Sequence, residues 1–126
     1  MEHLQDYIGR ILVGESEKVS YQLAYDTVYK LTKQRRQKEV MALLEEKVSS
    51  RLGEDLEGVE DVGKVTEIIK STCVHVTRVT EVCLFLDMNY CQKELGAPLI
   101  NKMQKVLFQT LCSRDKVLDI IAKGLF

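Results

Sequence analysis

Two histidines and four cysteines are the side chains best suited to bind a metal ion or to act as nucleophiles. The cysteines are Cys73, Cys83, Cys91 and Cys112, and no two of them form a CxxC pair. One hypothesis makes His75 a zinc ligand together with Cys73 or Cys83. Residues two and eight positions apart, however, do not share a helical face as metal ligands three or four positions apart do. We therefore expect His75 to flank a packed helix, and we expect no metal site.

The pattern also lacks a nucleophile, a base and an acid that would converge in space. Cys83 falls on the apolar seam of a predicted helix, which favours a small core side chain over a nucleophile. The carboxylates at 45–46 and 60–61 are adjacent in sequence, which is typical of a solvated acidic face rather than of an acid/base pair. No phosphate-binding GxxxxGK or GxGxxG motif occurs. The residues predict neither an enzyme nor a cofactor.

Five basic side chains lie within residues 30–38, KLTKQRRQK. One interpretation is a nucleic-acid patch. We favour a solvated helix junction, with the long aliphatic stems lying on apolar neighbours, because no aromatic residue interleaves for base stacking. The net charge of −1 supplies no global field that would attract nucleic acid or an anionic membrane.

Length and composition are those of one globular domain. The chain has 126 residues, 45% of them hydrophobic and 29% charged, which allows a sizeable core and argues against disorder. No apolar run approaches the length of a membrane span, and the first six residues lack the apolar segment of a signal peptide. We expect a protein of the cytoplasm and nucleus with four free, mostly buried thiols.

Spacings of three and four between apolar residues predict an all-α chain. Gly14 and Gly53 are expected to end the first and third helices, and an acidic connection follows Gly53. Ser16 or Ser20 can cap the second helix, and Ser113 can cap the last one. The predicted helices cover residues 4–12, about 20–32, about 37–52, about 62–92 and about 98–111, and a sixth starts near 113–115.

The strongest pattern belongs to the fourth predicted helix. Residues 74–90 are rich in Val and Thr, which by propensity alone favours a strand, but a strand would place Arg78 on one face with Val74 and Val76. A helical a/d repeat explains the apolar positions better, so we predict one long helix over about 62–92 with a seam that two copies could share. The seam residues are Val65, Ile69, Thr72, Val76, Val79, Cys83, Leu86 and Tyr90.

Three of the five tyrosines, Tyr21, Tyr25 and Tyr29, lie four residues apart in the second predicted helix. A second apolar stripe runs along the same helix from Leu23 to Leu31. Two stripes indicate either two buried surfaces or one buried and one exposed surface. Aromatic residues with a polar tip are enriched in interfaces, so the tyrosine stripe is a candidate binding surface. Packing of all three tyrosines in the core is the alternative.

Three stretches, taken in order, resemble the first repeat of the cullin N-terminal domain. Residues 20–31, SYQLAYDTVYKL, resemble the second cullin helix, with its Ser-aromatic start and Tyr-x-x-x-Tyr pair. Residues 82–92, VCLFLDMNYCQ, are similar to the end of the family's long fourth helix, and residues 114–125 resemble the helix leading into a second repeat. The likeness implies a cullin-repeat-like bundle of five helices plus the start of a sixth, in a single domain over residues 1–126.

The resemblance implies a non-catalytic scaffold of a multisubunit cullin-RING ubiquitin ligase. In the family, the second and fifth helices of the first repeat dock a BTB/POZ-fold substrate adaptor. The RING subunit binds a C-terminal cullin domain that has no counterpart in these residues, so we expect RING binding only through a domain outside this chain. Carried over by position, the adaptor contacts are Ser20, Tyr21, Gln22, Tyr25, Val28 and Tyr29 on the second helix, and Asn101, Lys102 and Lys105 on the fifth.

The chain departs from the family pattern at three places. Met88 stands where an arginine usually follows Asp87, Gln109–Thr110 stand where Arg-Asp is frequent, and Asn101 stands where an interface tyrosine is common. The last two departures fall on the fifth helix and bear on that half of the adaptor site. The alternative function is a helical-bundle regulatory or dimerisation protein unrelated to ubiquitin, which would form a weak homodimer.

Overall fold

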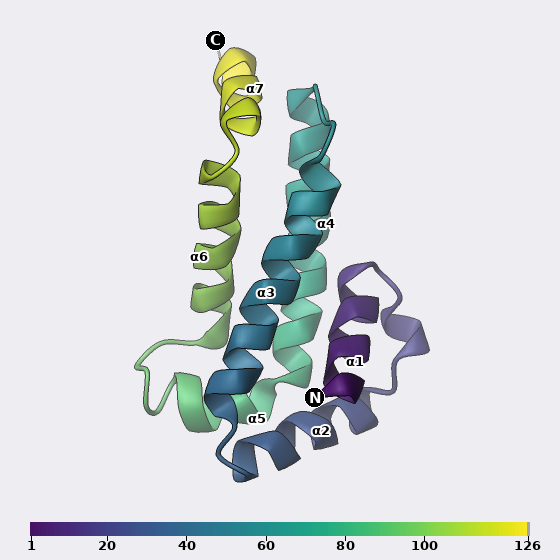
Figure 1. Ribbon diagram of the computed structural model, residues 1–126, viewed down its shortest axis with the longest axis vertical. Coiled ribbons are helices and arrows are strands. Elements are labelled where there is room, and N and C mark those ends of the chain that lie inside the picture. The colour runs from purple at the N-terminus through teal and green to yellow at the C-terminus, as the bar shows by residue number, and fades with distance from the viewer. Residues whose placement is uncertain (126) are drawn as a thin grey trace.

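The computed structural model describes residues 1–125, and this part of the chain is helical without strands (Figure 1). The predicted all-α class is confirmed. No helix in this range is both long enough and apolar enough to cross a membrane. The elements are α1 (Glu2–Leu12), a 3-10 turn η1 (Ser16–Lys18), α2 (Tyr21–Lys33), α3 (Gln37–Leu56), α4 (Val62–Val82), α5 (Leu84–Leu86), a π-helical turn η2 (Asp87–Cys91), α6 (Leu99–Cys112) and α7 (Asp115–Leu125).

Three helices, α3, α4 and α6, run side by side along the long axis of the molecule (Figure 1). The short α1 packs on α4 and α3, and α7 packs on α4 and α6 at one end of the bundle. At the other end α2 crosses the bundle and packs against α1, α3, α4 and α5 (Figure 1). Because α2 lies at an end, neighbours cover only part of its surface.

The predicted seam of the long helix forms part of the core. Its positions in α4 and α5 face other helices of the same chain, and a homodimer through this seam would require core residues to leave the bundle. Ile69 and Tyr90 are half-buried. The fully buried seam residues are Val65, Thr72, Val76, Val79, Cys83 and Leu86.

The prediction of one continuous helix over 62–92 is wrong. The α-helix ends at Val82, and Cys83 follows with φ −93° and ψ 20°. In the π-turn the Gln92 amide donates to the Asp87 carbonyl at 2.8 Å, a bond across five residues. The Asp87 carboxylate accepts from the Leu99 amide at 2.7 Å and so caps α6. This long-range bond ties the end of the segment to another helix, and the described residues form seven α-helices rather than five and the start of a sixth.

The predicted caps at the two ends of the α1–α2 connection are confirmed. Gly14, just after α1, has a φ of +85°, and a Cβ there would lie 3.3 Å from the ring Nε2 of His75. The Ser20 hydroxyl accepts a bond from the Leu23 amide at 3.3 Å and caps α2. These two residues fix where α2 begins.

The caps predicted at Gly53 and Ser113 are wrong. Helix α3 continues through Gly53 to Leu56, and Gly53 is buried because the guanidinium of Arg114 lies against it, 2.5 Å from where a Cβ would stand. Ser113 was predicted to cap the last helix, but it is the C-cap of α6, and its hydroxyl donates to the Thr110 carbonyl at 2.8 Å. Gly53 packs against the distant Arg114, and Ser113 bonds to the residue three positions before it. Neither residue therefore serves at the helix end that the sequence predicted for it.

Candidate partner-binding surface

The inner face of α2 anchors the helix in the core. Ala24 and Val28 are fully buried, and Leu31 and Thr32 are nearly so. Val28 was predicted to contact an adaptor, and this prediction is wrong because its side chain has no exposed surface. The stripe predicted from Leu23 to Leu31 is also split, since Leu23 is 56% exposed.

The outer face of α2 presents the tyrosines. Tyr21 is 51% exposed and Tyr29 is 40% exposed, so the core alternative does not hold for these two. Tyr25 is half-buried and stacks on Tyr21, with ring centroids 6.1 Å apart. The stripe predicted from the spacing of four residues is therefore a real surface feature.

A residue of the segment after α4 completes this surface. The Phe85 ring of α5 lies 4.5 Å from the Tyr29 ring, at an interplanar angle of 54°. The Tyr21 hydroxyl donates to the Glu81 carbonyl at 3.0 Å, near the end of α4. We call Tyr21, Tyr25, Tyr29 and Phe85 the aromatic face. Its fourth member was missed from the sequence, because Phe85 stands beside the predicted seam like any flanking core residue.

Two large apolar side chains of the same segment are also exposed. Leu84 is 43% exposed and Met88 is 56% exposed. They flank Phe85 in sequence, four residues apart, and Met88 stands where the family pattern has arginine. Exposed apolar residues next to an aromatic cluster are typical of a surface that a partner covers.

A cluster of cations lies at the carboxyl end of α2. The Lys33 ammonium is 5.7 Å from the Tyr29 ring centroid and 5.6 Å from that of Phe85. Arg36 pairs with Glu39 at 2.6 Å. Among the ion pairs of residues 1–125, none involves Lys30, Lys33 or Arg35, and all three are exposed. The solvated helix junction expected here is present, but it borders two aromatic rings.

The polar residues predicted at the start of α2 have local partners. The Ser20 hydroxyl is used as the helix cap. The Gln22 amide donates to the Asp26 carboxylate at 2.9 Å. Both residues are exposed, so their outward surfaces are free for a partner, while the Ser20 hydroxyl primarily sets the start of the helix.

The α6 residues predicted for the same site make contacts with other parts of the chain than α2. Asn101, Lys102 and Lys105 are exposed, and the Lys102 ammonium pairs with Glu45 of α3 at 3.4 Å. None of the three is hydrogen-bonded or ion-paired to α2 within residues 1–125. The structure therefore joins the α2 tyrosines directly to α5 rather than to α6.

A pocket of about 340 Å³ opens beside Tyr21. Ile11, Val19 and Val82 are its apolar lining residues, and Glu17, Arg78 and Glu81 are its charged ones. Its position next to the aromatic face makes it a place where one partner side chain can be buried.

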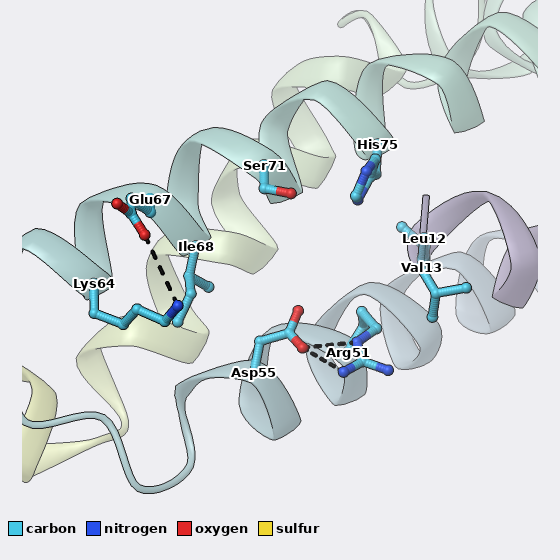
Figure 2. Close-up of a pocket in the computed structure, with 9 residues that line it drawn as sticks. All are labelled: Leu12, Val13, Arg51, Asp55, Lys64, Glu67, Ile68, Ser71 and His75. Carbon is cyan, nitrogen blue, oxygen red and sulfur yellow. Dashed lines mark hydrogen bonds and ion pairs between the residues drawn. The ribbon is translucent and has the colours of Figure 1, made fainter. Parts of the chain in front are cut away.

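A second hollow of about 500 Å³ lies between α3 and α4, beyond the end of α1 (Figure 2). Figure 2 shows Arg51 directed at Asp55 and Lys64 directed at Glu67, each pair within one helix. The Asp55 hydrogen bond and charge raise the pKa of Arg51 further above its ordinary value. Because each cation has its own carboxylate, this hollow has no excess charge with which to attract an ionic ligand.

The thiols divide into two buried and two exposed groups, and all four are free. The expectation of mostly buried thiols therefore holds only for Cys83 and Cys91. Burial raises the pKa of Cys83 to about 12, and burial together with the nearby Asp87 charge raises the pKa of Cys91 to about 11. Such thiols stay protonated near neutral pH and are poor nucleophiles. Residues 1–125 also contain no group of three or more His, Cys, Asp or Glu side chains placed to hold a metal ion.

Comparisons with protein-family models, with curated proteins and with solved structures find no match to this chain. The cullin likeness therefore stays a prediction from the residues. The surface that the geometry favours for a function is the aromatic face, together with its exposed neighbours and the pocket beside Tyr21.

Proposed function

We propose that this chain is a non-catalytic binding module that docks a BTB/POZ-fold substrate adaptor, as a cullin-repeat-like scaffold of a multisubunit cullin-RING ubiquitin ligase in the cytoplasm and nucleus. The observation that supports it most is the aromatic face, which exposes Tyr21 and Tyr29 at one end of the bundle. The ubiquitin part of the proposal rests on the resemblance to cullins.

The aromatic face has the physical properties of an interface centre. Interface hot spots are enriched in tyrosine, and rings held in place before binding lose little conformational entropy when a partner arrives. Tyr21 is held by its bond to the Glu81 carbonyl and by Tyr25, and Tyr29 is held by Phe85. The buried face of α2 keeps the whole row in register with the core.

The proposed contacts differ from the pattern carried over from the family. Tyr21, Gln22, Tyr25 and Tyr29 remain contacts on α2, Ser20 is assigned to the helix cap, and Val28 is removed because it is buried. Phe85 is added, because it lies against Tyr29. The exposed Leu84 and Met88 of the same segment extend the apolar area, and Asn101, Lys102 and Lys105 form a separate, secondary set on α6.

The direct test is the double variant Tyr21→Glu, Tyr25→Lys, used with the single variant Tyr29→Lys. Both are expected to abolish capture of purified BTB/POZ-fold proteins, while helical circular dichroism and a cooperative melting transition show that the variants still fold. Loss of folding in all of these variants would show that the tyrosines act only in packing and would contradict the proposal.

The matched control is Leu118→Lys on α7, at the opposite end of the bundle from α2 (Figure 1), where an apolar side chain is 40% exposed, as Tyr29 is. We expect this variant to bind adaptors as the wild type does. Binding that is lost with Leu118→Lys and kept with Tyr29→Lys would move the site to α7. Affinity purification of the full gene product distinguishes this proposal from a regulatory protein unrelated to ubiquitin. Only the proposal requires BTB/POZ-fold proteins and a RING subunit to co-elute.

A further inference from the structure

Lys33 occupies a corner formed by one residue of α2 and one of α5. Its ammonium lies within cation–π distance of both the Tyr29 and the Phe85 ring, at 5.7 and 5.6 Å from the centroids. The two rings are in mutual contact, so both border the position of the ammonium. The corner fixes a positive charge at the edge of the aromatic face.

The Lys33 ammonium can still bind a partner group, because the two rings satisfy only part of its charge. A lysine ammonium has three hydrogen-bond donors, and ring faces satisfy its charge only in part. Within residues 1–125 no carboxylate pairs with Lys33, and its neighbours Lys30 and Arg35 add charge of the same sign. A negative group from a partner would therefore meet an uncompensated positive edge.

We propose that the Lys33 corner selects partners by taking a carboxylate of a protein segment whose neighbouring side chains are apolar. The apolar side chains would cover Tyr29 and Phe85 together with the exposed Leu84 and Met88. The carboxylate would replace water on the ammonium and form a charge-assisted hydrogen bond. This proposal specifies which partner segment the aromatic face accepts. It rests on the proposed function only where it assigns the carboxylate to a BTB/POZ-fold adaptor.

The charge distribution along α2 also sets an orientation. The cations Lys30, Lys33 and Arg35 lie at its carboxyl end, while Asp26 lies further toward the amino end. The pocket beside Tyr21 is lined by two carboxylates, Glu17 and Glu81, and by one cation, Arg78. A partner segment with its acidic residue at the Lys33 end therefore fits better than the reverse arrangement, in which like charges would meet. A protein is favoured over nucleic acid because these carboxylates and the net charge of −1 oppose an extended polyanion.

The first experiment uses two peptides titrated into the ¹⁵N-labelled chain, acetyl-Leu-Phe-Glu-amide and acetyl-Leu-Phe-Gln-amide. We expect the Glu peptide to shift the amide resonances of Tyr29, Lys33 and Phe85, and the Gln peptide to shift them several-fold less at the same concentration. Lys33→Gln should remove this difference and Lys33→Arg should keep it. Equal shifts from the two peptides would overturn the proposal.

The matched control is Lys116→Gln, since Lys116 is an exposed lysine of α7 without an ion pair among the described residues. It should leave the difference between the peptides unchanged. A dT15 oligonucleotide is the nucleic-acid probe, and binding that is tighter than that of the Glu peptide and lost in Lys33→Gln would also overturn the proposal.

The second experiment measures the affinity of purified BTB/POZ-fold domains by isothermal titration calorimetry. We expect Lys33→Glu to weaken binding about tenfold and Lys116→Glu to leave it unchanged. Equal affinities of the wild type and Lys33→Glu would overturn the proposal while leaving the proposed function standing. If no BTB/POZ-fold domain binds but the peptides are discriminated, the carboxylate selectivity holds and the proposed function fails.

Discussion

The seam of α4 and α5 and the outer face of α2 come from the same kind of sequence pattern, apolar residues spaced by three and four, but they have opposite surroundings. Leu86 and Val79 of the seam have no exposed surface, whereas Tyr21 and Tyr29 are exposed by 51% and 40%. The seam is enclosed by helices on several sides, while α2 crosses the end of the bundle (Figure 1). Position in the bundle, rather than the strength of the pattern, separates a core surface from an exposed one.

The residue types fit the two surroundings. Val is the commonest seam residue, and it packs with Ile69, Cys83 and Leu86 in a close-packed interior where no buried side-chain nitrogen or oxygen of the described residues lacks a partner. The aromatic face uses tyrosine, whose hydroxyl can stay in water or bond to the backbone, as that of Tyr21 does with the Glu81 carbonyl. The comparison predicts that changes in the seam affect stability and that changes on the aromatic face affect binding.

The largest expected effect is in the seam. Leu86→Ala should lower the free energy of unfolding by about 2–5 kcal/mol, because a fully buried side chain leaves a cavity. Leu84→Ala, two residues away and 43% exposed, should change it by no more than about 0.5 kcal/mol. Urea denaturation of both variants measures this. Equal losses would remove the distinction between the buried and exposed sides of α5.

The second effect concerns the thiol in the seam. The pKa of Cys83 is raised by burial from 9.0 to about 12, so above pH 9 the unfolded chain loses this proton while the folded chain keeps it. Cys83 should therefore lower the free energy of unfolding by about 1 kcal/mol between pH 8 and 10, and Cys91, whose pKa is also raised, should add to this fall. Urea denaturation at both pH values should show this loss reduced in Cys83→Ala and unchanged in Cys73→Ala, whose thiol is exposed. The same pH dependence in both variants would show that Cys83 is not its source.

The third effect separates a cap from a contact on α2. Ser20→Ala should lower the free energy of unfolding by about 1 kcal/mol, because the Leu23 amide loses its acceptor. Ser20→Asp should retain the cap and the stability, measured by thermal denaturation followed by circular dichroism. Neither change should alter the adaptor affinity of the folded protein. A loss of affinity in Ser20→Asp at full stability would instead make Ser20 a direct contact.

The smallest effect is on the aromatic face itself. A double-mutant cycle of Tyr29→Ala and Phe85→Ala should give a coupling of about 0.5 kcal/mol in the free energy of unfolding, the lower end of the range for paired rings, because Tyr29 is 40% exposed. Additive losses would mean that the two rings do not support each other. In that case the aromatic face would be two independent patches rather than one surface.

The sequence by itself determined the helical class, the seam from Val65 to Leu86 and the row of tyrosines on α2, and it narrowed the cap of that helix to Ser16 or Ser20. These features depend on residues within a few turns of one another, so the helical period and local hydrogen bonding suffice to predict them. The bounds of α2, predicted as about 20–32, are observed as Tyr21–Lys33 for the same reason.

Only the tertiary structure decided which faces stay open and where the long helix breaks. The Asp87–Leu99 bond that accompanies the π-turn, the Arg114 guanidinium that lies on Gly53, and the Tyr29–Phe85 contact all join residues far apart in sequence. Val28 and Tyr29 are neighbours on one helix, yet one is buried and the other exposed. Their surroundings are set by which helices pack against α2, and no local pattern contains that information.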